Sequence, residues 1–167
     1  MSIEREGGSG LPEEEAVDPT VVFSESRSIL RVGERFTWRI CLLALMLAKC
    51  RGQAASVGTL HILSWALQTG TTRSLAIKWW RDPGTADIAT LRTDPRLDRT
   101  IAIAAAEHLV LVTARGRIEL TDRGRELGAL LDGEQGVMLT EKTFLRDLAP
   151  INDSQVSRRL GGSLLAS

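Results

Sequence analysis

The sequence predicts a mainly α-helical fold with one small β-hairpin. Apolar residues recur every three or four positions over most of residues 36–160, the spacing of helices that bury one face. At one place the spacing becomes a strict alternation on both sides of a short turn, through Val110, Val112, Ile118 and Leu120. A single hairpin among amphipathic helices therefore defines the predicted fold class.

The segment 94–131 contains the hairpin and the helices on either side of it. Asp94 is expected to cap the first helix, with Pro95 at its first position, where a missing N–H costs nothing. Gly116 lies in the turn and can adopt positive φ, and Thr121 is expected to cap the next helix. Because a helix, a hairpin and a helix in this order end a winged helix, we expect a winged helix-turn-helix with additional N- and C-terminal helices.

The earlier helices follow from apolar runs and capping residues. After Arg39 nearly every position up to Lys49 is apolar, which predicts a helix over 36–49 that is enclosed on most sides. Such a helix is either the central core helix or a helix that another chain covers in part. Ser56 is expected to cap a second helix and Thr72 a third.

The remaining segments complete the organisation of the chain. Residues 81–93 contain a Pro-Gly pair and predict an irregular connector. Thr140 is expected to cap a short helix, and a last helix runs from Asn152 or Asp153 to Leu160, where a Gly-Gly pair stops it. We therefore expect a disordered acidic tail (1–28), a winged-helix domain (29–139) and C-terminal helices that pack on it (140–167).

Charge is distributed unevenly along a chain whose formal net charge is zero. Residues 1–18 hold six acids against one arginine, so the other residues carry 15 acids and 20 bases, a net charge of +5. The positive charge is almost entirely arginine, 18 Arg to 3 Lys, which suits bidentate pairing with carboxylate or phosphate. Within the acidic tail, we expect Val21–Phe23 to form a short docking segment.

Several classes of protein are not expected. The N-terminus has no basic region followed by an apolar one, and the longest apolar run, Ile40–Ala48, is far short of the ~20 residues of a membrane span. Cys41 and Cys50 show no metal-ligand spacing and are expected to be unpaired thiols. These patterns predict a cytoplasmic protein without a membrane segment.

The motifs that mark common enzymes are absent from the sequence. It contains no Gly-rich phosphate loop followed by Lys, no HExxH, no Cys pair and no nucleophile elbow. His61 and Trp65 share a helix face, and a lone histidine beside a tryptophan is typically a packed, hydrogen-bonded residue. We therefore expect no enzyme activity, no catalytic residue, no metal and no cofactor.

Nucleic-acid binding is a sharper hypothesis, because the helix before the hairpin and the hairpin itself are the DNA-binding elements of winged helices. Arg96 and Arg99 lie on a face that continues into Ile103 and Ala106, and an apolar continuation does not suit base reading. Any DNA contact is therefore expected to involve phosphates and to be independent of base sequence. The arginines predicted for it are Arg96, Arg99, Arg115, Arg117, Arg123 and Arg125.

Protein docking is the hypothesis that the residues favour, because an apolar continuation of this helix face suits a protein surface and the predicted domain has surplus apolar surface for its size. Trp79 and Trp80 are consecutive and cannot both face one core, so one of them should be partly exposed. The residues predicted for docking are Trp38, Leu42, Leu45, Trp79, Trp80 and Ile103.

Four segments in this order also carry a family resemblance: TLHILSWAL, TDPRLDRTIAIAAAEHLV, GRIELTDRGRELG and DSQVSRRLGG. Over about residues 35–162 the chain resembles the middle components of bacterial three-component ABC-ATPase systems, near which Lamassu-type systems belong. LTDRG alone is shared with many winged helices, including MarR-like and PadR-like regulators. The long acidic tail departs from the compact start expected of the family.

The resemblance implies a non-enzymatic winged-helix adaptor that bridges an SMC- or Rad50-like ATPase and an effector in defence against phages and plasmids. It implies no catalytic residues. Two other readings remain open. One is a homodimeric winged-helix transcription regulator, and the other is an assembly subunit whose wing arginines clamp DNA for the ATPase.

Overall fold

The computed structural model describes residues 32–82 and 94–165, with side chains described over 36–82 and 94–160. Over these residues the chain is mainly helical with one small antiparallel sheet, which confirms the predicted coarse fold class. The predicted disordered tail lies outside the described residues, as does the predicted connector from residue 83 onward. No helix in the described part of the chain is long and apolar enough to cross a membrane.

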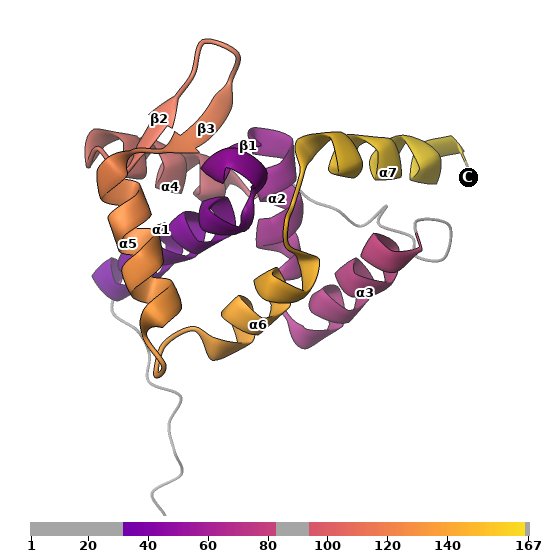
Figure 1. Ribbon diagram of the computed structural model, residues 1–167, viewed down its shortest axis with the longest axis horizontal. Coiled ribbons are helices and arrows are strands. Elements are labelled where there is room, and N and C mark those ends of the chain that lie inside the picture. The colour runs from indigo at the N-terminus through magenta and orange to yellow at the C-terminus, as the bar shows by residue number, and fades with distance from the viewer. Residues whose placement is uncertain (1–31, 83–93, 166–167) are drawn as a thin grey trace, which may run out of the picture.

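The described elements follow one another along the chain as Figure 1 shows. The helices are α1 (Val32–Lys49), a 3₁₀ turn (Arg51–Gln53), α2 (Val57–Ala66), α3 (Gly70–Arg81), α4 (Pro95–Ala106), α5 (Asp122–Gly133), α6 (Leu139–Leu148) and α7 (Asp153–Leu165). The strands are β1 (Ala54–Ser56), β2 (Val110–Val112) and β3 (Arg117–Leu120).

Helix α1 is the centre of the core. The residues from Leu42 to Leu47 are all buried, because α4, α5 and α6 pack around this helix together with β1 and β3. In Figure 1, α5 crosses in front of α1. The apolar run at 36–49 was predicted to be either the central core helix or a helix that another chain covers in part. The first alternative is confirmed, because helices and strands of the same chain enclose it.

The predicted capping residues of three helices are confirmed. Ser56, Asp94 and Thr121 cap α2, α4 and α5, and the side-chain oxygen of each accepts a hydrogen bond from a backbone N–H two or three residues later. Pro95 is the first residue of α4, as predicted. These caps fix where each helix begins because they satisfy N–H groups that have no partner inside the helix.

Other predicted helix boundaries were wrong. Thr69, not Thr72, caps α3, and the two threonines form a reciprocal capping box that starts the helix earlier. Helix α6 begins at Leu139 after Met138 in left-handed conformation, so Thr140 lies inside the helix. Helix α7 continues to Leu165 through the Gly-Gly pair that was expected to stop it.

The sheet contains one strand that the sequence did not predict. Ala54–Ser56 is too short to show an alternating pattern, yet it pairs antiparallel with β3 in a register that places Ala55 opposite Ile118. Because β2 also pairs with β3, the strand order is β1-β3-β2. The hairpin is thereby hydrogen-bonded to β1, the segment that follows α1 and the 3₁₀ turn.

The C-terminal helices attach beside the end of α1. The backbone N–H of Arg51 donates to the Ile151 carbonyl oxygen at 2.7 Å, and the N–H of Ile151 donates to the Lys49 carbonyl oxygen at 3.1 Å. Phe144, Leu145 and Leu148 form one apolar face of α6 and are buried. The spacing of Leu127, Leu130 and Leu131 in the sequence predicts one buried apolar face for α5, but Leu130 is 69% exposed, because α5 faces α1 with Gly128 and Leu131.

Candidate functional site

The hairpin is closed by a short turn that local residues determine. The N–H of Thr113 donates to the Arg117 carbonyl oxygen at 2.8 Å, and the N–H of Gly116 donates to the Thr113 carbonyl oxygen at 2.9 Å. Gly116 has a φ of 71°, which other residues adopt only with strain. Arg115 lies at the tip and is exposed, as predicted.

Helix α4 lies directly before the hairpin and presents arginines on its outer face. Its inner face is buried against the core through Leu97 and Ile101. Arg96 and Arg99 are exposed, and the guanidinium carbon of Arg99 lies 5.3 Å from the ring centre of Phe36. Together with Arg115, these are the predicted nucleic-acid residues whose side chains form neither an ion pair nor a hydrogen bond within the described part of the chain.

The other three predicted arginines are engaged by groups of this chain. Arg117 donates to the Ala54 carbonyl oxygen at 3.2 Å and pairs with Asp153 at 3.2 Å. Arg123 donates to a backbone carbonyl oxygen at the end of α4, and Arg125 pairs with the acid three residues before it. These side chains therefore have roles within the fold.

The net charge of the region from α4 to α5 is not positive. Residues 94–133 contain six arginines and seven acids, which gives a net charge of −1. The acids are Asp94, Asp98, Glu107, Glu119, Asp122, Glu126 and Asp132. The surface of these elements thus lacks the excess of positive charge on which phosphate binding depends.

Three of the predicted docking residues belong to the core. Leu42, Leu45 and Trp79 are buried, so their prediction as partner contacts was wrong. The physical reason is that α1 is enclosed by helices of the same chain, and Trp79 is the inward member of the tryptophan pair. Trp38 is 37% exposed. Ile103 is half-buried on α4 and remains accessible in part.

The tryptophan pair divides as the sequence predicted, with one ring in the core and one at the surface. The two ring centres lie 6.2 Å apart at 57°. Trp80 is half-buried, and the guanidinium carbon of Arg159 from α7 lies 4.9 Å from its ring centre. Cation–π contact with Arg159 therefore holds part of the Trp80 surface against the C-terminal helix.

His61 is a packed residue, as its sequence context predicted. Its Nδ1 accepts a hydrogen bond from the backbone N–H of Asp94 at 3.3 Å, and its Nε2 lies 3.5 Å from Asp98. The imidazole thus links α2 to the start of α4. Among the described residues, no group of three His, Cys, Asp or Glu side chains is arranged to hold a metal ion.

The feature that sequence reasoning missed is the outer edge of β2. In the strand order β1-β3-β2, no strand of the described residues pairs with this edge. The Leu109 carbonyl oxygen accepts from the N–H of Thr121, and the N–H of Thr113 donates to the Arg117 carbonyl oxygen, so both residues bond toward β3. The alternation of an antiparallel ladder therefore turns the N–H and C=O of Val112 outward. Leu111 is 57% exposed and Val112 50%.

The opposite edge of the sheet is protected. At β1, the backbone N–H of Ser56 donates to the carboxylate of Asp153 at 3.0 Å. Edge strands with unpaired backbone groups and apolar side chains are templates for pairing with another chain, and proteins usually block them with charge or proline. The sequence contained a signal for this exposed apolar edge. In the run Val110–Val112 residue 111 is apolar, whereas strict alternation predicts a polar residue there.

Comparison of the chain with protein-family models, curated proteins and solved structures finds no match.

Proposed function

We propose that the chain is a winged-helix adaptor that binds a protein partner along the open edge of β2. The strand order β1-β3-β2, with α4 placed directly before the β2–β3 hairpin, supports the winged-helix assignment. In this assignment α4 takes the position of the recognition helix and the hairpin is the wing.

The observation that carries the proposal is the exposed edge of β2. An extended segment of a partner adds to such an edge through main-chain hydrogen bonds, while alternate side chains give specificity. Leu111 and Val112 lie on opposite faces of the hairpin and are each at least half exposed. Full burial of an aliphatic side chain contributes about 1.5–3 kcal/mol, so the two together can support a specific complex.

The charge of the site favours a protein partner over DNA. The region from α4 to α5 has a net charge of −1, and Arg117, Arg123 and Arg125 are engaged within the chain. A winged helix that reads bases presents polar side chains along its recognition helix. Here Arg96 and Arg99 are followed by half-buried Ile103. DNA contact, where it occurs, is limited to a few phosphates.

The resemblance to middle components of three-component ABC-ATPase systems supplies the identity of the partners. We infer that the chain bridges an SMC- or Rad50-like ATPase and an effector in a bacterial system directed against phages or plasmids. The role is non-enzymatic and cytoplasmic in this proposal. An adaptor requires surfaces rather than catalytic groups, and the β2 edge is a surface of the required kind.

The test is co-purification with the ATPase and effector encoded beside the gene. The chain should form a complex that survives gel filtration. Val112→Pro removes the backbone N–H that points outward from the edge strand. Leu111→Thr removes apolar area but keeps the strand propensity. Each should weaken the complex by about tenfold or more. Leu130→Gln is the matched control, because it alters an exposed leucine of α5.

Two outcomes would contradict the proposal. One is a chain that remains alone after co-expression. The other is a pair of β2 variants that bind the partners as tightly as the native chain does. A homodimeric transcription regulator predicts instead selective binding to its own promoter. Arg96→Ala and Arg115→Ala would then reduce affinity unequally on different DNA sequences, whereas phosphate contact predicts an equal loss on all of them.

A further inference from the structure

The outer edge of β2 is complementary to a second copy of itself. Its N–H and C=O groups at Val112 point away from β3, and no strand of the described residues takes them up. One residue thus presents both a donor and an acceptor at the edge. When two such edges run antiparallel with Val112 opposite Val112, each N–H meets the C=O of the other copy. A two-fold axis beside Val112 therefore satisfies the outward groups of both chains.

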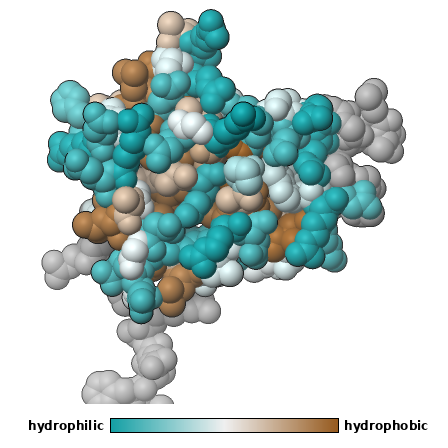
Figure 2. Space-filling view, viewed as in Figure 1, coloured by the Kyte–Doolittle hydropathy of each residue, from teal (hydrophilic) through white to brown (hydrophobic). Residues whose placement is uncertain are grey.

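The same arrangement covers the apolar side chains of the edge. Leu111 and Val112 lie on opposite faces of the hairpin, and both are exposed. Figure 2 shows apolar atoms on the β2 side of the hairpin, next to hydrophilic side chains at its tip. In the paired strands the two Val112 side chains are neighbours on one face, and each Leu111 lies opposite Thr113 of the other copy on the second face. Pairing thus reduces the exposed apolar area on both faces.

The charges of the hairpin select the antiparallel direction. Arg115 lies at the tip, and Glu107 lies at the base, where α4 ends. Both side chains are exposed, and neither forms an ion pair or a hydrogen bond within the described part of the chain. Antiparallel pairing brings the tip of each copy towards the base of the other, so that Arg115 approaches Glu107 twice. The partial negative charge at the end of α4 adds to this attraction, whereas parallel pairing would bring like charges together.

We propose that two copies of this chain pair their β2 edges antiparallel about Val112 and so protect the edge while no other partner occupies it. Self-pairing rests on the proposed function for the use of the edge by a partner, and it assigns a regulation to that edge. Pairing and partner binding need the same N–H and C=O groups, so they exclude each other. A pair of short strands buries less area than a standard interface, and a dissociation constant of about 10–100 µM is expected. A tighter partner can then displace the second copy.

Sedimentation velocity of the isolated full-length chain tests the proposal. The chain should be monomeric at about 1 µM and largely dimeric at about 300 µM. Arg115→Glu or Glu107→Arg alone places like charges at both contacts between tip and base, so each should weaken the dimer roughly tenfold. Lys78→Glu is the matched control, because it reverses an exposed charge on α3, away from the hairpin (Figure 1), and should leave the dimer unchanged.

The two hairpin charge variants can be combined to separate specific pairing from a general effect of charge. When Arg115→Glu and Glu107→Arg chains are mixed in equal amounts, opposite charges meet at both contacts only in the heterodimer. The heterodimer should therefore form with an affinity within about threefold of the native dimer. A chain that carries both substitutions should regain self-association for the same reason. Salt at about 0.5 M should reduce the differences between these variants.

Three results would overturn the proposal: a chain that stays monomeric at about 300 µM, a dimer that Val112→Pro leaves intact, and mixed charge variants that form no heterodimer. The charge variants lie at exposed positions, so they test the pairing even where Val112→Pro disturbs the hairpin. The samples contain neither ATPase nor effector. A missing dimer therefore leaves the co-purification test of the proposed function standing, and failed co-purification with an intact dimer rejects that function alone.

Discussion

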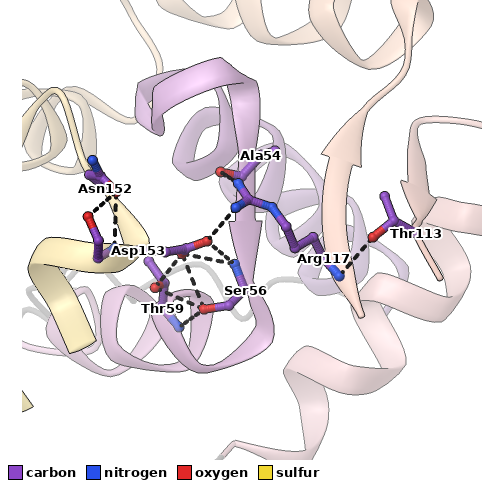
Figure 3. Close-up of polar contacts among 8 residues, drawn as sticks. Ala54, Ser56, Thr59, Thr113, Arg117, Asn152 and Asp153 are labelled. Carbon is purple, nitrogen blue, oxygen red and sulfur yellow. Dashed lines mark hydrogen bonds and ion pairs between the residues drawn. The ribbon is translucent and has the colours of Figure 1, made fainter. Parts of the chain in front are cut away.

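Asp153, in the first turn of α7, lies 3.2 Å from the Nη1 of Arg117 on strand β3, and the two side chains join parts of the chain that are 36 residues apart. The same carboxylate accepts hydrogen bonds from the backbone N–H and hydroxyl of Ser56 and from the hydroxyl of Thr59 (Figure 3). Arg117 also donates to the Ala54 carbonyl oxygen. A single acid thus connects α7, β1, α2 and the hairpin.

Removing this carboxylate should destabilise the fold. Asp153→Ala leaves two hydroxyls and a backbone N–H without their acceptor in a part-buried site, so we expect a loss of about 1–3 kcal/mol in the free energy of unfolding. Urea denaturation measures it. The exposed pair Arg125–Asp122 is the control, and Asp122→Ala should cost less than about 0.5 kcal/mol. Equal costs for the two variants would show that the network adds nothing to stability.

Gly124 should not tolerate a side chain. It lies in the first turn of α5, and a Cβ at this position would come within 2.0 Å of the Leu109 carbonyl oxygen, which is backbone and cannot move aside cheaply. This close approach gives a physical reason for glycine in LTDRG. Gly124→Ala should cost about 3 kcal/mol or more in unfolding free energy.

Gly128 is the matched comparison on the same helix. A Cβ there would lie 3.3 Å from the Cβ of Ala48, a contact that a shift of a few tenths of an ångström relieves. The gain in helix propensity offsets part of that strain, so Gly128→Ala should change stability by less than about 1 kcal/mol. Thermal and urea unfolding of both variants test the contrast. A small loss of stability in the Gly124→Ala variant would contradict the close approach of position 124 to the Leu109 carbonyl oxygen.

The ion pair between Asp132 and Lys49 should make stability depend on pH. The Lys49 ammonium, 2.8 Å away, holds the pKa of Asp132 below its ordinary value. A lowered folded pKa contributes stability above the unfolded pKa of about 3.9, and this contribution is lost as pH falls towards the folded pKa. Because Asp132 is more than a third exposed, the contribution is less than about 1 kcal/mol.

Asp132→Asn isolates this effect. The variant should be less stable than the native chain from pH 7 down to about pH 5, and the two should converge below about pH 4. Urea unfolding across this range measures the difference. Salt should also reduce it, since the pair is partly exposed. A difference that persists unchanged into strong acid would show that the carboxylate acts through packing instead.

Cys50 should resist alkylation while the protein is folded. Burial, and to a smaller extent the nearby Asp153 carboxylate, raise the pKa of Cys50 to about 12, while Arg117 partly opposes them. Since the thiolate is the reactive form, almost none is present at pH 8. Iodoacetamide should modify Cys41 before Cys50, and denaturant should remove the difference. Equal labelling of the two thiols in the folded protein would contradict this burial.

Local interactions account for most of what the sequence predicted correctly. Asp94 and Thr121 cap helices through N–H groups two or three residues away, and Gly116 closes a turn within five residues. The alternation through Val110 and Ile118 marks the hairpin for the same reason. Such contacts depend on neighbours in the chain, so a residue pattern carries them. The coarse fold class followed from these elements.

The site depended on contacts between distant residues. The sequence alone determined a mainly helical chain with one hairpin, the caps that begin three of its helices and the exposed arginines of α4. Only the tertiary structure enclosed Leu42 and Leu45 within this chain, added β1 to β3, and directed Arg117 to Asp153. It also left β2 as an open edge. The physical reason is that burial and edge position are set by which segments pack together, and residue spacing within one segment does not encode its neighbours.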